Sequence, residues 1–210
     1  MQRLTRMNAR SACALLCLLL AGATFAGPRP HTHDGFFLRL APGFGGASSS
    51  YDDADGEVSL DGGAGIMDIA IGAMVSESLA LHATLFGWSI SDPDAEFDYS
   101  DGTSLDGEVP GDFTLGAFGI GVTNYFGPSN VYLSASLGAG SLTLDVEGLG
   151  DFESDTGFAG EIACGKEWWV GNNWGLGVAG VFGFHSIPDA DTDEKFSGGN
   201  FGVLFSATFN

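Results

Sequence analysis

Downstream of residue 34, the chain alternates between segments dominated by glycine and apolar residues and segments rich in acidic, glycine and serine residues. Within the apolar segments, apolar side chains recur at every second position, which is the periodicity of a β-strand and not of a helix. The last segment sets Phe201, Val203 and Phe205 against Gly202 and Ser206. The pattern predicts strands over residues 35–47, 63–75, 79–91, 112–126, 131–146, 157–170, 174–187 and 198–209.

The connections between these segments alternate between long and short. The short ones cover residues 76–78, 127–130 and 171–173, and the long ones cover residues 48–62, 92–111, 147–156 and 188–197. Bacterial outer-membrane barrels keep their tight turns at one end and their long loops at the other, and about 9–11 tilted residues cross the bilayer. The sequence therefore predicts an all-β fold, an eight-stranded antiparallel up-and-down transmembrane β-barrel over residues 35–210.

Two details of the pattern carry further expectations. In the segment 131–146 the apolar positions change parity, from Leu133 and Leu137 to Leu142 and Leu144, which indicates either a bulge near residues 138–140 or an extension beyond the membrane. Aromatic residues near the strand ends are typical of interfacial girdles. The residues assigned to girdles are Trp88, Tyr125, Phe126, Tyr132, Trp168, Trp169 and Trp174.

The first residues have the layout of a secretory signal peptide. Arg3, Arg6 and Arg10 precede an apolar run over residues 12–23, and small residues follow up to Ala26. A membrane-spanning helix needs about 20 apolar residues, more than this run offers. We expect a signal peptide over residues 1–26, a short periplasmic tail over residues 27–34 and a barrel that reaches the outer membrane through the periplasm.

The charge balance is strongly acidic, with 7 Lys and Arg against 27 Asp and Glu and a formal net charge of −20. Such a polyanion repels nucleic acid, so we expect no nucleic-acid partner. Most of the acids lie in or beside the four long connections. The exceptions are Asp34, Asp68, Glu77, Glu161 and Glu167.

The signal peptide, the eight-strand meander and the aromatic alternation ending in Phe209 resemble small outer-membrane proteins of the OmpA/OmpX type. Residues 33–40 are similar to the first strand of uncharacterised bacterial "outer membrane protein beta-barrel domain" proteins. The resemblance implies a monomer inserted by the barrel-assembly machinery, in contact with outer-membrane lipid and lipopolysaccharide. That group usually ends on an aromatic residue, whereas here Asn210 follows Phe209.

Among the ionisable residues on the inward face of the predicted strands, we assign four to a lumen group: Arg39, Asp68, Glu161 and His82. If the first hairpin folds about residue 54, Arg39 lies nearly opposite residues 68–70. In an interior too narrow for a channel, an Arg39–Asp68 pair mainly satisfies buried charge, and Glu161 and His82 would extend it. The alternative is a gate or a proton path.

Catalysis and metal binding find little support in the sequence. His185 and Ser186 are adjacent on one predicted strand and so point to opposite faces, which prevents one from serving the other as a base. Asp189, Asp191 and Asp193 have the spacing of a calcium loop, but Glu194 occupies the sixth position, where glycine is needed. We therefore predict no enzyme, no cofactor and no dedicated metal site. Bridging of the acidic loops to lipopolysaccharide phosphate by divalent cations stays open.

The function predicted from the sequence is non-enzymatic: a structural or surface-interaction barrel that displays acidic extracellular loops. A narrow pore for small solutes is the first alternative, because many inward glycines could loosen the packing. A lipid A-modifying barrel enzyme is the second.

Overall fold

The computed structural model describes residues 31–52, 56–190 and 194–210, so the predicted signal peptide lies outside the described residues. Eight long strands form the body of the molecule: β1 (Phe36–Asp52), β2 (Gly56–Ser76), β3 (Leu79–Ser91), β6 (Gly111–Phe126), β7 (Val131–Val146), β9 (Gly157–Trp169), β10 (Trp174–Pro188) and β11 (Lys195–Phe209). Three shorter strands, β4 (Asp94–Tyr99), β5 (Ser104–Glu108) and β8 (Gly150–Glu153), and the 3-10 turn η1 (Gly127–Ser129) complete the described elements.

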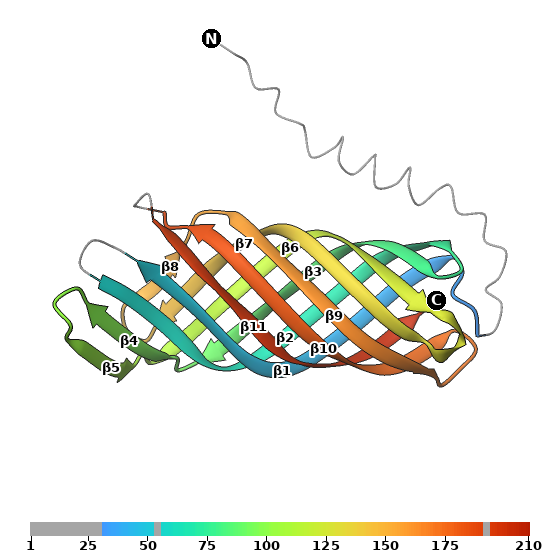
Figure 1. Cartoon of the computed structure of the whole chain (residues 1–210), viewed down its shortest axis with the longest axis horizontal. Helices are drawn as coiled ribbons and strands as arrows, with labels where there is room; N and C mark the ends of the chain where they lie inside the picture. Colours follow the sequence, from blue (N-terminus) through green and yellow to red (C-terminus); the bar gives the residue numbers. More distant parts are fainter. Residues whose placement is uncertain (1–30, 53–55, 191–193) are drawn as a thin grey trace, which may run out of the picture.

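The eight long strands close into a ring. Each pairs antiparallel with its neighbours in chain order, and β1 pairs with both β2 and β11. Figure 1 shows these strands tilted around one long axis. The predicted eight-stranded antiparallel barrel is therefore confirmed. Within the ranges 31–52, 56–190 and 194–210, no helix is long and apolar enough to cross a membrane.

The two ends of the barrel differ. We call the end with the tight connections after β2, β6 and β9 the turn end, and the end with the four long connections the loop end. In Figure 1 the turn end lies at the right, beside the C-terminus, while β4, β5 and β8 lie at the left. In the first hairpin Arg39 pairs with Ala70 and Ala41 with Asp68, so the predicted placement of Arg39 opposite residues 68–70 is confirmed.

The loop end carries more strand structure than the sequence predicts. Residues 48–62 and 92–111 are predicted as loops, yet β1 continues to Asp52, β2 starts at Gly56, and the hairpin β4–β5 fills most of the second connection. β4 pairs with residues 56–61 of β2, and β5 pairs with β4. β8 likewise pairs with residues 143–146 of β7. The sheet thus extends past the closed ring.

The outward side chains of the ring form an apolar band. On β2 these are Met67, Ile69 and Ile71, while Asp68 and Ala70 between them are buried inside. The same face of other strands exposes Leu40, Phe44, Leu81, Leu85, Phe118, Ile120, Leu133, Ile162, Leu176, Phe182 and Phe205. Water-soluble monomers rarely expose a continuous apolar surface of this extent, so this is the surface of a barrel that spans a lipid bilayer.

Toward the loop end the two faces exchange polarity without a change of register. On β2 the outward residues become Glu57 and Asp61, and the inward residue between them, Leu60, is buried. On β7 the inward residue becomes Leu142. The β6–β7 pairing runs without a break from Gly111↔Val146 to Phe126↔Val131, so the predicted bulge is wrong. The alternative, an extension beyond the membrane, stays a prediction; the structure shows that residues 143–146 pair with β8 and not with a strand of the ring on that side.

The predicted aromatic girdles are partly wrong. Phe126, Trp168 and Trp174 are exposed on the outer face, as expected. Trp88, Tyr125 and Tyr132 instead point into the barrel and are buried. They fill the lumen, because they fall on the inward parity of their strands.

The closing seam has a local irregularity at Pro42. The β1–β11 register is the same at Leu40↔Ala207 and at Gly43↔Leu204, but the pairing is interrupted between them at Ala41 and Pro42. Pro42 has no N–H to donate. A shallow apolar hollow lies on the outer face here, lined by Leu40, Pro42, Met67, Ile69, Leu176, Gly177, Phe205, Ser206 and Ala207. This hollow opens toward the membrane side of the wall.

Candidate functional site in the barrel lumen

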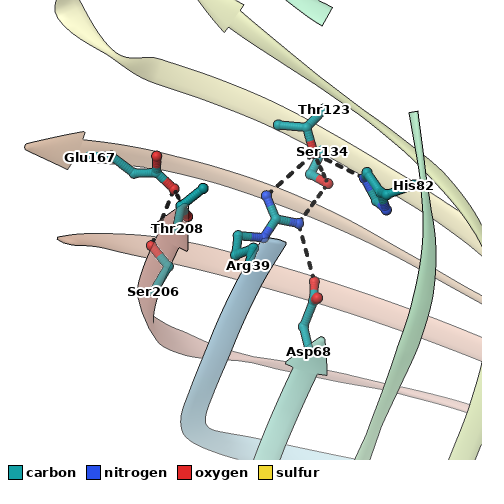
Figure 2. Close-up of polar contacts among 8 residues, drawn as sticks. All are labelled: Arg39, Asp68, His82, Thr123, Ser134, Glu167, Ser206 and Thr208. Carbon is teal, nitrogen blue, oxygen red and sulfur yellow. Dashed lines mark hydrogen bonds and ion pairs between the residues drawn. The ribbon is translucent and has the colours of Figure 1, made fainter. Parts of the chain in front are cut away.

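Arg39 is the centre of a buried polar network in the turn half of the lumen. It projects inward from β1 and is 1% exposed. Its guanidinium donates to Asp68 Oδ2 at 3.3 Å, to Ser134 Oγ at 3.0 Å and to Thr123 Oγ1 at 3.3 Å (Figure 2). A buried charge is tolerated only when it is paired and hydrogen-bonded, and this network provides both.

Aromatic rings enclose the guanidinium. The Arg39 Cζ atom lies 5.1 Å from the Tyr132 ring centroid and 5.8 Å from that of Phe37, at cation–π distance. Phe37 also stacks on His82, with the ring centroids 5.5 Å apart. The His82 Nε2 atom is 3.1 Å from Thr123 Oγ1, which joins His82 to the same network. These contacts fix the geometry of the guanidinium from several strands at once.

Glu161 is the fourth residue that the sequence places in this group. It projects from β9, is buried, and lies close enough to Asp68 and Arg39 to interact electrostatically with both. The structure thus brings together Arg39, Asp68, His82 and Glu161 from four different strands. Their predicted role, compensation of buried charge, stays a prediction.

A second buried group, centred on Glu167, was missed by sequence reasoning. Its carboxylate accepts hydrogen bonds from Thr208 Oγ1 at 2.6 Å, from Tyr125 Oη at 3.1 Å and from Ser206 Oγ at 3.5 Å. Figure 2 shows Glu167, Ser206 and Thr208 beside the Arg39 group. Strand parity could have found it, since Glu167 shares the inward face of β9 with Glu161.

The described part of the N-terminal tail contacts the turn end of the lumen. His33 stacks on Tyr125 at a centroid distance of 3.7 Å, and its Nε2 atom lies 3.3 Å from Asn130 Oδ1. His31 stacks on Trp169 at 5.6 Å. Residues 31–34 therefore cover this opening, a role that the sequence did not suggest, while residues 27–30 of the predicted tail lie outside the described residues.

On strands β2, β3, β6 and β7 the loop half of the lumen is lined by apolar side chains. One row of inward neighbours crosses four adjacent strands as Ile66↔Trp88↔Leu115↔Leu142. A second row beside it runs Ala64↔Ile90↔Phe113↔Leu144. All are buried except Leu144, which is partly buried. We call these two rows the apolar layer.

A histidine and a serine do meet inside the loop half, but not the pair weighed from the sequence. The His185 Nε2 atom lies 2.9 Å from Ser49 Oγ, and both residues are buried. Ser186 falls on the opposite parity, as expected. Among the described residues the other ring nitrogen, Nδ1, has no hydrogen-bond partner. A nucleophile and base without an orienting acid lack the third group of a triad.

A metal centre finds no support in the part of the chain that the structure describes. No group of three or more His, Cys, Asp or Glu side chains there has a metal-binding arrangement. Asp191 and Asp193 of the acidic run near residue 190 lie outside the described residues. Cys164 is a free cysteine, exposed on the outer side of β9.

No family model matches the sequence, and the comparison with curated proteins gives no match. Among solved structures, the chain is similar to neisserial surface protein A, at 16% identity over 81% of this chain and 96% of that one, with a TM-score of 0.45. It is also similar to the attachment invasion locus protein Ail of Yersinia pestis (13%, 82% and 99%, TM-score 0.44) and to the outer membrane protein OprG of Pseudomonas aeruginosa (15%, 86% and 99%, TM-score 0.44). The eight-stranded ring itself rests on the strand pairing of this chain.

Proposed function

We propose that the protein is a non-enzymatic outer-membrane barrel with a closed lumen, and that its loop end serves as a surface-interaction module outside the cell. The observation that carries this proposal is the filling of the lumen. Inward side chains occupy it from the turn end, where His33 stacks on Tyr125, to the loop half, where Trp88 and Ile90 are buried.

A closed lumen follows from the size of the ring and from its two kinds of filling. Eight strands leave an interior that side chains alone can fill. In the turn half, Arg39 spans the lumen to reach Thr123 and Ser134 on distant strands. In the loop half, the apolar layer would have to be hydrated before an ion could pass, which is costly for buried apolar side chains.

The outer face of the loop half supports exposure to water. It carries carboxylates where the ring below it carries apolar side chains, so the membrane boundary lies between Asp61 and Met67 on β2. An acidic surface just above a membrane suits bridging by divalent cations to anionic lipid phosphates, an interaction that the sequence left open. Lipopolysaccharide offers such phosphates only in the outer leaflet of the outer membrane.

Conductance in planar bilayers tests the closed lumen. The purified barrel should give no steady ion current. A variant with Trp88→Gly and Phe113→Gly, which removes two large side chains of the apolar layer, is the matched control and should conduct more than the parent. A steady current through the unaltered protein would overturn the proposal and favour the narrow pore.

Cysteine labelling in intact cells tests the orientation. In a Cys164→Ala background, Ser104→Cys on β5 and Ser78→Cys in the turn after β2 place single thiols at opposite ends, and both positions are exposed. A maleimide that cannot cross membranes should label Ser104→Cys in intact cells and Ser78→Cys only after lysis. The reverse pattern would place the loop end in the periplasm and contradict the surface role.

A further inference from the structure

The strand β5 leaves one edge of the loop-end sheet open. Among the described residues β5 pairs only with β4, and all five of its residues are exposed. The bonds Tyr99 N–H to Thr103 O (2.8 Å) and Val109 N–H to Pro93 O (3.0 Å) fix which pairs bond in this hairpin. By strand alternation, Ser104, Asp106 and Glu108 direct their N–H and C=O groups away from β4. An open edge of this kind is a template for a further strand.

One face of this extension carries carboxylates at most positions, with Ser59 and Ser104 between them. It is formed by residues 56–61 of β2 with β4 and β5, which contain no Lys or Arg. The register sets like charges directly opposite one another: Glu57↔Asp98, Asp61↔Asp94, Glu96↔Asp106 and Asp94↔Glu108. Each such opposition is destabilising. At the hairpin tip, hydrogen bonds from the Thr103 hydroxyl and N–H to Asp101 hold the pKa of that carboxyl below its ordinary value, which keeps it charged.

The other face of the extension is apolar and changes from buried to exposed toward the tip. Leu60 and Ala95, nearest the ring, are buried. Phe97, Tyr99 and Leu105 are 37%, 44% and 59% exposed, and Phe97 and Leu105 are direct cross-strand partners. This exposed patch adjoins the open edge of β5, because Leu105 lies between Ser104 and Asp106 on that strand.

We propose that the edge of β5 binds an extended basic polypeptide segment, which adds to the sheet as a further strand with alternating basic and apolar side chains. Its backbone pairs with Ser104, Asp106 and Glu108, its basic residues face the carboxylates, and its apolar residues cover the patch at Phe97 and Leu105. The inference rests on the proposed surface role and supplies its partner class.

Charge also disfavours pairing of this edge with a second copy of this chain. Charged residues on an edge strand are a common defence against edge-to-edge association. Two β5 strands side by side would bring Asp106 and Glu108 against carboxylates of the same kind. A basic strand meets no such repulsion, and its positive charges reduce the repulsion between the carboxylates that already face one another. The edge therefore favours basic partners over acidic ones.

The test uses the full barrel in lipid nanodiscs and a short peptide that alternates Lys with Val. We expect binding that weakens as salt is raised, since exposed charges are screened within about 8–10 Å at physiological ionic strength. The control peptide has the same sequence with N-methyl groups on the residues that would pair with β5, which removes the backbone donors and keeps the charges. It should not bind.

Two variants at one position separate the backbone from the charge. Asp106→Pro removes the open-edge N–H while leaving the bonds to β4, and proline is tolerated on such edges. Asp106→Asn removes the charge and keeps the N–H. We expect Asp106→Pro to weaken binding by about tenfold or more, because it loses one edge hydrogen bond and its ring clashes with the added strand. We expect Asp106→Asn to weaken binding by about twofold to threefold, because it loses only one screened charge.

Each result decides the matter. Equal binding of the methylated peptide or equal effects of the two variants would show electrostatic attraction without strand addition and overturn the proposal. Absence of binding, or a dimer that Asp106→Pro dissolves in sedimentation, would overturn it as well. If the peptide binds but labelling places the loop end in the periplasm, the edge site is supported and the surface role is contradicted. If labelling places the loop end outside the cell but the peptide does not bind, the edge site is contradicted and the surface role is unaffected.

Discussion

The turn half and the loop half of this barrel share one strand register but distribute polarity in opposite ways. In the turn half the wall is apolar outside, at Ile69 and Ile71, and polar inside, around Arg39 and Asp68. In the loop half the wall is acidic outside, at Glu57 and Asp61, and apolar inside, at Leu60 and Trp88. The pleat is the same in both halves, so the solvent on the outside must account for the difference.

This inversion shows what each half needs for stability. Where lipid surrounds the wall, the outside can be apolar at no cost, and the few buried charges must be satisfied by one another. Where water surrounds the wall, the inside takes over the role of a hydrophobic core, as in a soluble sheet. The barrel therefore combines two stabilising strategies, and variants in each half should fail for different reasons.

The largest effect is expected from Arg39→Ala, which leaves Asp68 buried without its cation. Removal of one partner of a buried ion pair costs about 3–5 kcal/mol of unfolding free energy. Urea unfolding of the barrel in detergent micelles, followed by tryptophan fluorescence, would measure it. The double variant Arg39→Met with Asp68→Leu removes both charges and should recover most of the loss. A loss below about 1 kcal/mol for Arg39→Ala alone would contradict the prediction.

The apolar layer should respond as a core does. Ile90 is 1% exposed, so Ile90→Ala leaves a cavity and should cost about 2–5 kcal/mol in the same unfolding assay. Leu105→Ala, in the exposed patch of β5, is the matched control and should change the unfolding free energy by no more than about 0.5 kcal/mol. Equal losses of unfolding free energy for the two variants would mean that the β4–β5 hairpin packs as tightly as the apolar layer, and would contradict the prediction.

The outer faces can be compared with one substitution. Ile120→Arg places a charge in the middle of the apolar band, where it should cost about 2–4 kcal/mol. Ser59→Arg places the same charge on the outer face of the loop half, opposite Glu96, and should be neutral or slightly stabilising. Unfolding in lipid vesicles gives both values. A penalty at Ser59 similar to that at Ile120 would move the membrane boundary past β4.

Sequence reasoning recovered the ring but not the extension, and the inversion explains why. Strands were recognised by apolar residues at every second position. This rule holds for residues 63–75 of β2 and fails for residues 56–62, where the outward positions become acidic. Those residues therefore resemble a loop. The pairing of Arg39 with Asp68 could be predicted from the register of the first hairpin. The contacts of Arg39 with Thr123 and Ser134 could not, because contacts across the lumen depend on how the ring closes. Glu167 was within reach of the parity argument that identified Glu161.

The smallest effects concern two threonines of one strand, β6, that lie in the two halves. Thr123 is buried in the turn half and is hydrogen-bonded with Arg39, His82 and Ser134. Thr123→Val keeps the shape and removes the hydroxyl, so its partners lose a contact in a dry interior and about 1–3 kcal/mol is expected.

Thr114 faces outward in the loop half, where its hydroxyl lies 2.8 Å from Ser89 Oγ in a cross-strand pair. Water can replace that contact, so Thr114→Val should cost about 0.2–1 kcal/mol. Chemical denaturation of the two variants side by side measures the difference directly. If Thr114→Val proved the costlier of the two, the outer face of β6 would lie out of water at that position, and the inversion of polarity would begin nearer the loop end than Asp61 indicates.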